Sequence, residues 1–184
     1  LYEKLLHQQN SERSLSEKIQ IYNQSLPFLL KGAWQTIKIS FLAMLVAVFV
    51  GLVLVSMRLY SPRFLQILAA LFIELIRGTP LLLQLFFIFY ALPNFGIEIS
   101  AFAAAVLGLG INYSVQESEI YRSGILSVHK NQIEGAKMLG LNGWQIFWSI
   151  KVPQAFKFCL PPMTTDFIAL IKDSSLVSVI TMVE

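Results

Sequence analysis

Two aspartates stand seven residues apart, at Asp166 and Asp173, in the otherwise mostly apolar stretch "DFIALIKD". On an α-helix, seven residues turn the chain by about 700°, so both carboxylates lie within about 20° of one face and about 10 Å apart. Carboxylates inside a membrane-spanning helix are costly and are therefore functional candidates. This pair could bind the ammonium group and a cationic side chain of an amino acid. Two plainer interpretations stay open: Asp166 pairs with a basic group on another helix, and Asp173, next to Lys172, is a charge at a helix end.

Further polar side chains interrupt apolar segments. Asn112 is equally a candidate for a helix–helix hydrogen bond and for a ligand contact, and Gln84 is a weaker pocket candidate. The stretch "VQESE" at residues 115–119, which contains Glu117, follows shortly after Asn112. It either alters the pocket or faces a cytoplasmic vestibule, and we favour the vestibule. Glu74 and Arg77 are three residues apart, which predicts that they pair with each other on one helix.

The composition indicates the environment of these residues. Of 184 residues, 55% are hydrophobic and only 14% are charged, whereas a soluble domain has roughly 25% charged residues. A membrane protein is therefore expected. The small net charge of +3, with scattered basic residues, argues against nucleic acid as a partner. The single cysteine, Cys159, excludes a disulfide within the chain, and His7 and His129 stand alone, so we expect no metal site and no enzyme activity.

Apolar runs predict an all-α bundle of about five membrane spans. The first covers residues 37–57, the second about 64–92, the third starts near residue 99, the fourth covers about 153–171, and a fifth starts near residue 175 and is cut short. Residues 1–31 form a polar N-terminal segment, and residues 32–184 form the membrane domain. Pro80 is expected to kink the second span, and Pro161 and Pro162 to distort the fourth.

Loop charges predict the orientation. The stretch between spans three and four carries Arg122, Lys130, Lys137 and Lys151, whereas the loop after span two has no Lys or Arg. Basic loops stay on the cytoplasmic side, so residues 118–153 are expected in the cytoplasm and the N-terminus outside. The basic residues within 1–36 argue against this orientation.

The half-polar segment "EGAKMLGLNGWQIFWSIKVP" occupies residues 134–153 of that stretch. Its aromatic residues require a packing partner, and Gly140 and Gly143 divide it into two short helices. It is either a docking surface or an interfacial helix that rests its Trp side chains among lipid headgroups.

The segment resembles the coupling motif of bacterial ABC importer permeases, written E-A-A, three residues, G, nine residues, I, one residue, L-P. The residues at matching positions are Glu134, Gly135, Ala136, Gly140, Ile150, Val152 and Pro153. Gly135 departs from Ala in this motif, as Val152 does from Leu.

Residues 74–93, 118–141 and 166–180 resemble the subfamily for polar amino acids of the histidine, glutamine and arginine type. The resemblance implies a type I importer fold in the bacterial inner membrane, with substrate contacts at Asp166, Asp173 and Asn112. It also implies a second permease subunit, identical or sister, an ATPase dimer docked on the coupling segment, and an extracytoplasmic binding protein or fused binding domain. ATP and Mg²⁺ belong to the ATPase, because this chain has no Gly-x-x-x-x-Gly-Lys-Ser/Thr loop and so needs no cofactor of its own.

The expected function is therefore the permease subunit of an ATP-driven importer for polar amino acids, with basic ones among the candidates. The alternative is a channel or a structural subunit without ATP coupling. The sequence does not fix the substrate, nor whether a binding domain precedes Leu1.

Overall fold

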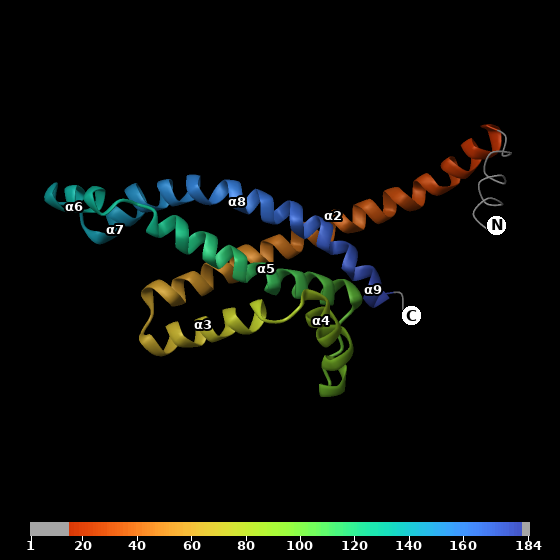
Figure 1. Ribbon diagram of the computed structural model, residues 1–184, viewed down its shortest axis with the longest axis horizontal. Coiled ribbons are helices and arrows are strands. Elements are labelled where there is room, and N and C mark those ends of the chain that lie inside the picture. Colours follow the sequence, from red (N-terminus) through yellow and green to blue (C-terminus); the bar gives the residue numbers. More distant parts are fainter. Residues whose placement is uncertain (1–14, 182–184) are drawn as a thin grey trace, which may run out of the picture. The chain divides into compact units, whose positions relative to one another are not determined.

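The computed structural model describes residues 15–181, and this part of the chain is helical without a strand. Its elements are α2 (Leu15–Tyr60), α3 (Arg63–Arg77), α4 (Leu81–Phe86), η1 (Phe87–Ala91), η2 (Leu92–Phe95), α5 (Ala101–Leu126), α6 (Lys130–Met138), α7 (Gly143–Ile146), η3 (Phe147–Lys151), α8 (Val152–Asp173), η4 (Ser174–Leu176) and α9 (Val177–Thr181). The all-α fold predicted from the apolar runs is confirmed (Figure 1).

Helix α2 contains the first predicted span, residues 37–57, and extends well beyond it at its N-terminal end. The helix runs through Pro27 and through the predicted boundary between residues 31 and 32. The contacts within the chain divide it after Ile37 into two compact units. The N-terminal unit contributes the first, exposed part of α2, and residues 1–14 of the predicted polar segment lie outside the described residues.

A sharp break separates α3 from α4. Helix α3 ends at Arg77, Pro80 occupies the position before α4, and the two parts are bent by 102°. Proline lacks the amide proton that continues a helix, and the residue before it avoids helical geometry. The kink predicted at Pro80 is therefore present, as a complete break of the helix.

Helices α5 and α8 form the largest packed pair of the second unit, and small residues allow their close approach. A Cβ atom on Gly124 of α5 would collide with the Cys159 sulfur of α8. A Cβ atom on Gly110 would lie 2.7 Å from the Val46 side chain of α2. Glycines of α5 thus allow its close contacts with α8 and α2.

Prolines 161 and 162 lie inside α8, and the helix continues through both. The expected distortion does not interrupt it. Two hydroxyls that follow the prolines bond to backbone carbonyls there: Thr164 donates to the Leu160 carbonyl at 2.8 Å and Thr165 to the Pro161 carbonyl at 3.2 Å.

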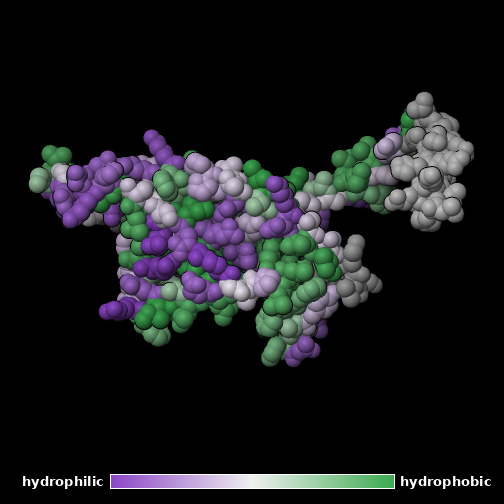
Figure 2. Space-filling view, viewed as in Figure 1, coloured by the Kyte–Doolittle hydropathy of each residue, from purple (hydrophilic) through white to green (hydrophobic). Residues whose placement is uncertain are grey.

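Among the described helices, the part of α2 from Tyr22 to Tyr60 is by itself long and apolar enough to cross a membrane. The bent pair of α3 and the segment from Leu81 to Phe95 is a second candidate. Helices α5 and α8 occupy the positions predicted for spans three and four, but both carry several charged residues. In Figure 2, hydrophilic residues gather over α5 and toward α6, and hydrophobic residues cover the region of α4.

Candidate functional site

The segment predicted to couple to a partner forms two short helices joined by a turn. Helix α6 ends at Met138, and α7 begins at Gly143. Gly140 in the turn has φ = 83°, a conformation that side chains with a Cβ disfavour. The prediction of a turn at Gly140 is confirmed, and Gly143 opens the second helix behind the cap residue Asn142, which accepts a bond from the Gln145 amide at 2.9 Å.

Large apolar side chains of this segment are exposed. Met138 is 88% exposed, Leu139 82%, Trp144 71% and Trp148 52%. Trp144, Phe147 and Trp148 form one ring cluster, and Phe147 contacts Tyr60 at the end of α2 edge-on. Such a rigid, partly apolar surface is typical of a docking interface.

The motif residues have different roles in this surface. Ala136 is buried and anchors α6, whereas a Cβ on Gly135 would meet nothing within 4 Å. The exposed carboxylate of Glu134 lies 3.4 Å from Lys130, one turn earlier on α6. Pro153 is exposed in the first turn of α8, and the next residue, Gln154, donates to Gln132 of α6 at 2.7 Å.

The two aspartates lie toward the same helix. The Tyr113 hydroxyl of α5 donates to Asp173 at 2.8 Å, and Asp166 lies close enough to the same tyrosine to interact with it electrostatically. One oxygen of Asp166 is buried and has no hydrogen-bond partner among the described residues. Within residues 15–181 neither aspartate pairs with a basic side chain, so two partly buried carboxyl groups have no cationic partner at this place.

The two amides form a contact at the helix break. Asn112 of α5 donates to the Gln84 carbonyl oxygen at 3.2 Å. The Gln84 amide nitrogen donates to the carbonyls of Ile76 and Thr79, at 2.8 Å and 3.1 Å, and to the Thr79 hydroxyl. Gln84 therefore satisfies backbone acceptors exposed by the break. Of the two interpretations of Asn112, the structure shows the helix–helix hydrogen bond.

Two expectations about charged residues are wrong. Arg77 does not pair with Glu74 in the described part of the chain. It lies 3.9 Å from Glu119 of α5, which also binds Arg58 and, at 3.1 Å, Arg122. The local spacing on α3 favoured the pair with Glu74, but the more buried carboxylate on α5 attracts the guanidinium.

The other wrong expectation concerns Glu117, which is 0% exposed and faces no vestibule. A Cβ on Gly51 would lie 2.9 Å from the Cβ of Glu117, so Glu117 sits at a close contact between α2 and α5. Neither of its carboxylate oxygens has a hydrogen-bond partner in the described part of the chain. Its electrostatic neighbours include Asp166 and Tyr121.

Sequence reasoning missed Tyr113 and Glu119. Each contacts a residue about 60 positions away in the chain, and only the packing of α5 against α2, α3 and α8 brings the partners together.

Comparison with known proteins agrees with this geometry. The sequence profile of the family described as "binding-protein-dependent transport system inner membrane component" matches residues 43–183, which is most of the chain. The chain belongs to this family. The resemblance stated from the motifs is confirmed, and the chain is the permease subunit of an ABC importer, not itself a catalytic subunit.

Individual relatives cover most of the chain. It is 39% identical over 161 residues to the probable amino-acid ABC transporter permease protein YckA of Bacillus subtilis, covering 88% of this chain and 71% of that protein. It is 36% identical to the glutamine transport system permease protein GlnP of Escherichia coli, with 87% and 74% covered.

Solved structures confirm the type I importer fold. One described as an amino acid ABC transporter with histidines is 38% identical and has a TM-score of 0.82, covering 88% of this chain and 76% of that chain. A methionine ABC transporter in an inward-facing conformation has a TM-score of 0.67 at 19% identity, covering 83% and 74%, and shows the fold alone.

Proposed function

We propose that this permease subunit moves polar amino acids across the bacterial inner membrane, driven by a cytoplasmic ATPase dimer that docks on residues 134–153. A second permease subunit completes the pathway, and an extracytoplasmic binding protein or domain delivers the substrate. ATP and Mg²⁺ are held by the ATPase. In this orientation the N-terminus lies outside and residues 118–153 lie in the cytoplasm.

The exposed apolar surface of α6 and α7 supports the docking step. Met138, Leu139 and Trp144 are exposed apolar side chains on a half-polar segment, outside the apolar runs predicted to span the membrane. The turn at Gly140 fixes the angle between the two helices. A partner that binds α6 and α7 together can move α5 and α8 as rigid bodies. This is because α6 follows α5 directly and η3 leads directly into α8.

The two aspartates without a cationic partner support the substrate class. Asp166 keeps an unpartnered buried oxygen, and Asp173 has one oxygen bound to a tyrosine hydroxyl. A substrate with an ammonium group, and above all one with a second cationic group, satisfies such oxygens. Relatives whose names mention glutamine and cystine permeases are consistent with polar amino acids as substrates.

The test is substrate-stimulated ATP hydrolysis by the complete importer in proteoliposomes, measured for arginine, lysine, histidine and glutamine separately. We expect stimulation by at least one of them and none by leucine. A transport rate that is independent of ATP would favour the alternative of a channel, and absence of any associated ATPase would favour a structural subunit.

A further inference from the structure

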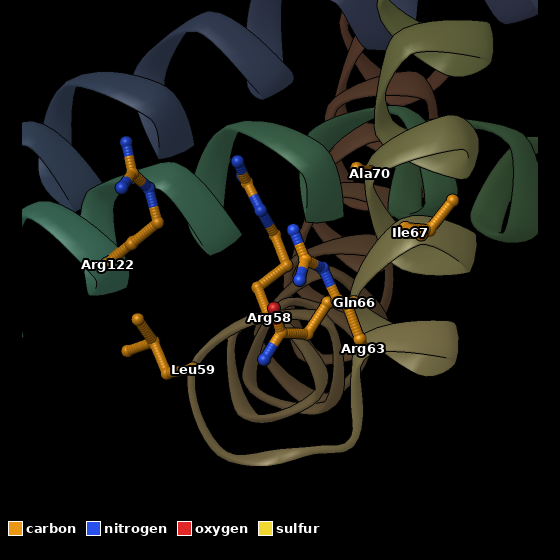
Figure 3. Close-up of a pocket in the computed structure, with 7 residues that line it drawn as sticks. All are labelled: Arg58, Leu59, Arg63, Gln66, Ile67, Ala70 and Arg122. Carbon is orange, nitrogen blue, oxygen red and sulfur yellow. The ribbon is translucent and has the colours of Figure 1, made fainter.

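A pocket of about 340 Å³ lies where α2 turns into α3, next to the ion pairs of Glu119 with Arg58 and Arg122. It is lined by the side chains Arg58, Leu59, Arg63, Gln66, Ile67, Ala70 and Arg122. Figure 3 shows Arg58, Arg63 and Gln66 gathered at this turn, with Arg122 reaching in from α5. Three guanidinium groups in one pocket are unusual for a chain with only 14% charged residues.

The pocket keeps a positive charge after its internal pairing. Glu119 is the carboxylate that contacts Arg58 and Arg122. Arg63 has no ion pair among the described residues, and Arg77 approaches Glu119 from α3 only at 3.9 Å. The three guanidinium groups of the lining therefore exceed the carboxylate by two charges. The N-terminus of α3 at Arg63 adds a partial positive charge.

An apolar stripe continues from the pocket along α3. Phe64 is 75% exposed, Ile67 56%, Leu71 62% and Leu75 64%. Spacings of three and four residues place these side chains on one face of the helix. Ile67 belongs both to the pocket lining and to the stripe. One ligand that carries an anionic group and an apolar chain would satisfy both surfaces.

We propose that this pocket binds the phosphodiester headgroup of an anionic phospholipid, whose acyl chains lie along the apolar stripe of α3. Guanidinium groups bind phosphate oxygens with paired, charge-assisted hydrogen bonds. Basic pockets between membrane helices are suited to such headgroups. The inference rests on the membrane location of the family and adds a lipid site to the proposed transport function without depending on the substrate.

Binding of a headgroup in this pocket would also affect the coupling segment. The pocket lies at the end of α2 where Tyr60 contacts Phe147 of the coupling segment. A headgroup held by Arg58 and Arg63 would stabilise the turn between α2 and α3 next to that contact.

The test is lipid titration of the purified full chain in detergent, read by native mass spectrometry. Phosphatidylglycerol and phosphatidylcholine with the same acyl chains are compared, since they share the apolar part. We expect phosphatidylglycerol to bind about tenfold more tightly to the wild type. Equal affinity for the two lipids would overturn the proposal, because the pocket would then not read the headgroup charge.

Arg63→Gln is the informative variant, because Arg63 is exposed and its loss leaves Glu119 with its other partners. We expect a fivefold to tenfold loss of phosphatidylglycerol affinity and no change for phosphatidylcholine, by analogy with about 1 kcal/mol for each basic residue near a charged lipid surface. Arg63→Lys should lose less. Lys157→Gln, which removes an exposed cation of α8 outside the pocket, should match the wild type.

Two controls separate the other occupants. Inorganic phosphate, added alone, should not displace phosphatidylglycerol; displacement at similar concentration would assign the pocket to a free anion and overturn the lipid site. The titration is repeated with the complete importer. Loss of the phosphatidylglycerol preference in the complex would show that a protein subunit covers the pocket, and would also overturn the proposal. Neither result depends on transport activity.

Discussion

The coupling segment and the polar interior of α5 and α8 differ in how far apart their hydrogen-bond and ion-pair partners lie in the sequence. In the coupling segment, Glu134 contacts Lys130, and Gln145 and Asn142 bond to each other, all within four residues. In the interior, Tyr113 reaches Asp173 and Glu119 reaches Arg58, about 60 residues away. The first region presents its apolar groups outward, and the second buries its charged groups. We infer that a partner protein completes the first region and a substrate completes the second.

The largest effect is expected for a change at Gly140, in the turn of the coupling segment. Gly140→Leu should abolish uptake while the protein still inserts, since φ = 83° is strained for leucine and the angle between α6 and α7 would change. Uptake of a labelled amino acid by cells and the level of protein in the membrane are measured together.

Gly135→Ala is the matched control. Gly135 also lies in the motif, but an added Cβ meets nothing within 4 Å, and alanine favours the helix. Uptake should stay at the wild-type level. If both glycine variants lose uptake equally, the turn at Gly140 is not the special feature of this region.

The next effect concerns the interior. Asp166→Asn keeps the shape of the side chain and removes its charge. A charge-assisted hydrogen bond contributes about 1.5–3 kcal/mol, so apparent affinity for arginine or lysine should fall roughly tenfold to a hundredfold. Glutamine should be affected much less. Substrate-stimulated ATP hydrolysis in proteoliposomes gives these affinities.

Glu98→Gln removes an exposed carboxylate from the loop before α5 and serves as the comparison for Asp166. Equal losses for every substrate in Asp166→Asn would indicate a structural role for this residue. No loss for any substrate would place Asp166 outside the pathway and remove the argument for cationic substrates.

A smaller effect is expected at the link between α5 and α8. Tyr113→Phe removes the hydroxyl that donates to Asp173 and leaves the ring in its buried position. Hydrogen bonds between membrane helices contribute on average about 0.6 kcal/mol and at most about 1.7 kcal/mol. The unfolding midpoint in detergent should therefore fall by a few degrees, measured by thermal melting. An unchanged midpoint would mean that water or substrate replaces the lost donor.

Local rules predicted the features of the chain that depend on neighbouring residues. Pro80 predicted a kink, which the structure shows as the break between α3 and α4, and Gly140 predicted the turn between α6 and α7. Both residues act on their own backbone. Pro161 and Pro162 predicted a distortion of α8, whereas this helix continues through both.

Long-range pairing could not be predicted from one sequence. The spacing of Glu74 and Arg77 favours a pair on α3, and nothing local indicates that Glu119 of α5 competes for the arginine. Glu117 has polar neighbours in the sequence, which suggested a position in contact with water. In the structure the close approach of Gly51 buries it. The spacing of Asp166 and Asp173 predicts that they share a helical face. It does not predict the hydrogen bond from Tyr113 of α5 to Asp173.

In the proposed function, residues 134–153 face the cytoplasm and dock on the ATPase. Met138 is 88% exposed at the end of α6, so Met138→Cys in a Cys159→Ser background places a single reactive thiol on this surface. An impermeant thiol reagent should leave it unlabelled in intact cells, label it in inverted membrane vesicles stripped of ATPase, and label it more slowly when ATPase is restored. Glu98→Cys in the same background should show the opposite sidedness. Labelling of the Met138→Cys thiol from outside intact cells would contradict the cytoplasmic location of residues 134–153. An unchanged labelling rate with ATPase present would contradict their docking on the ATPase.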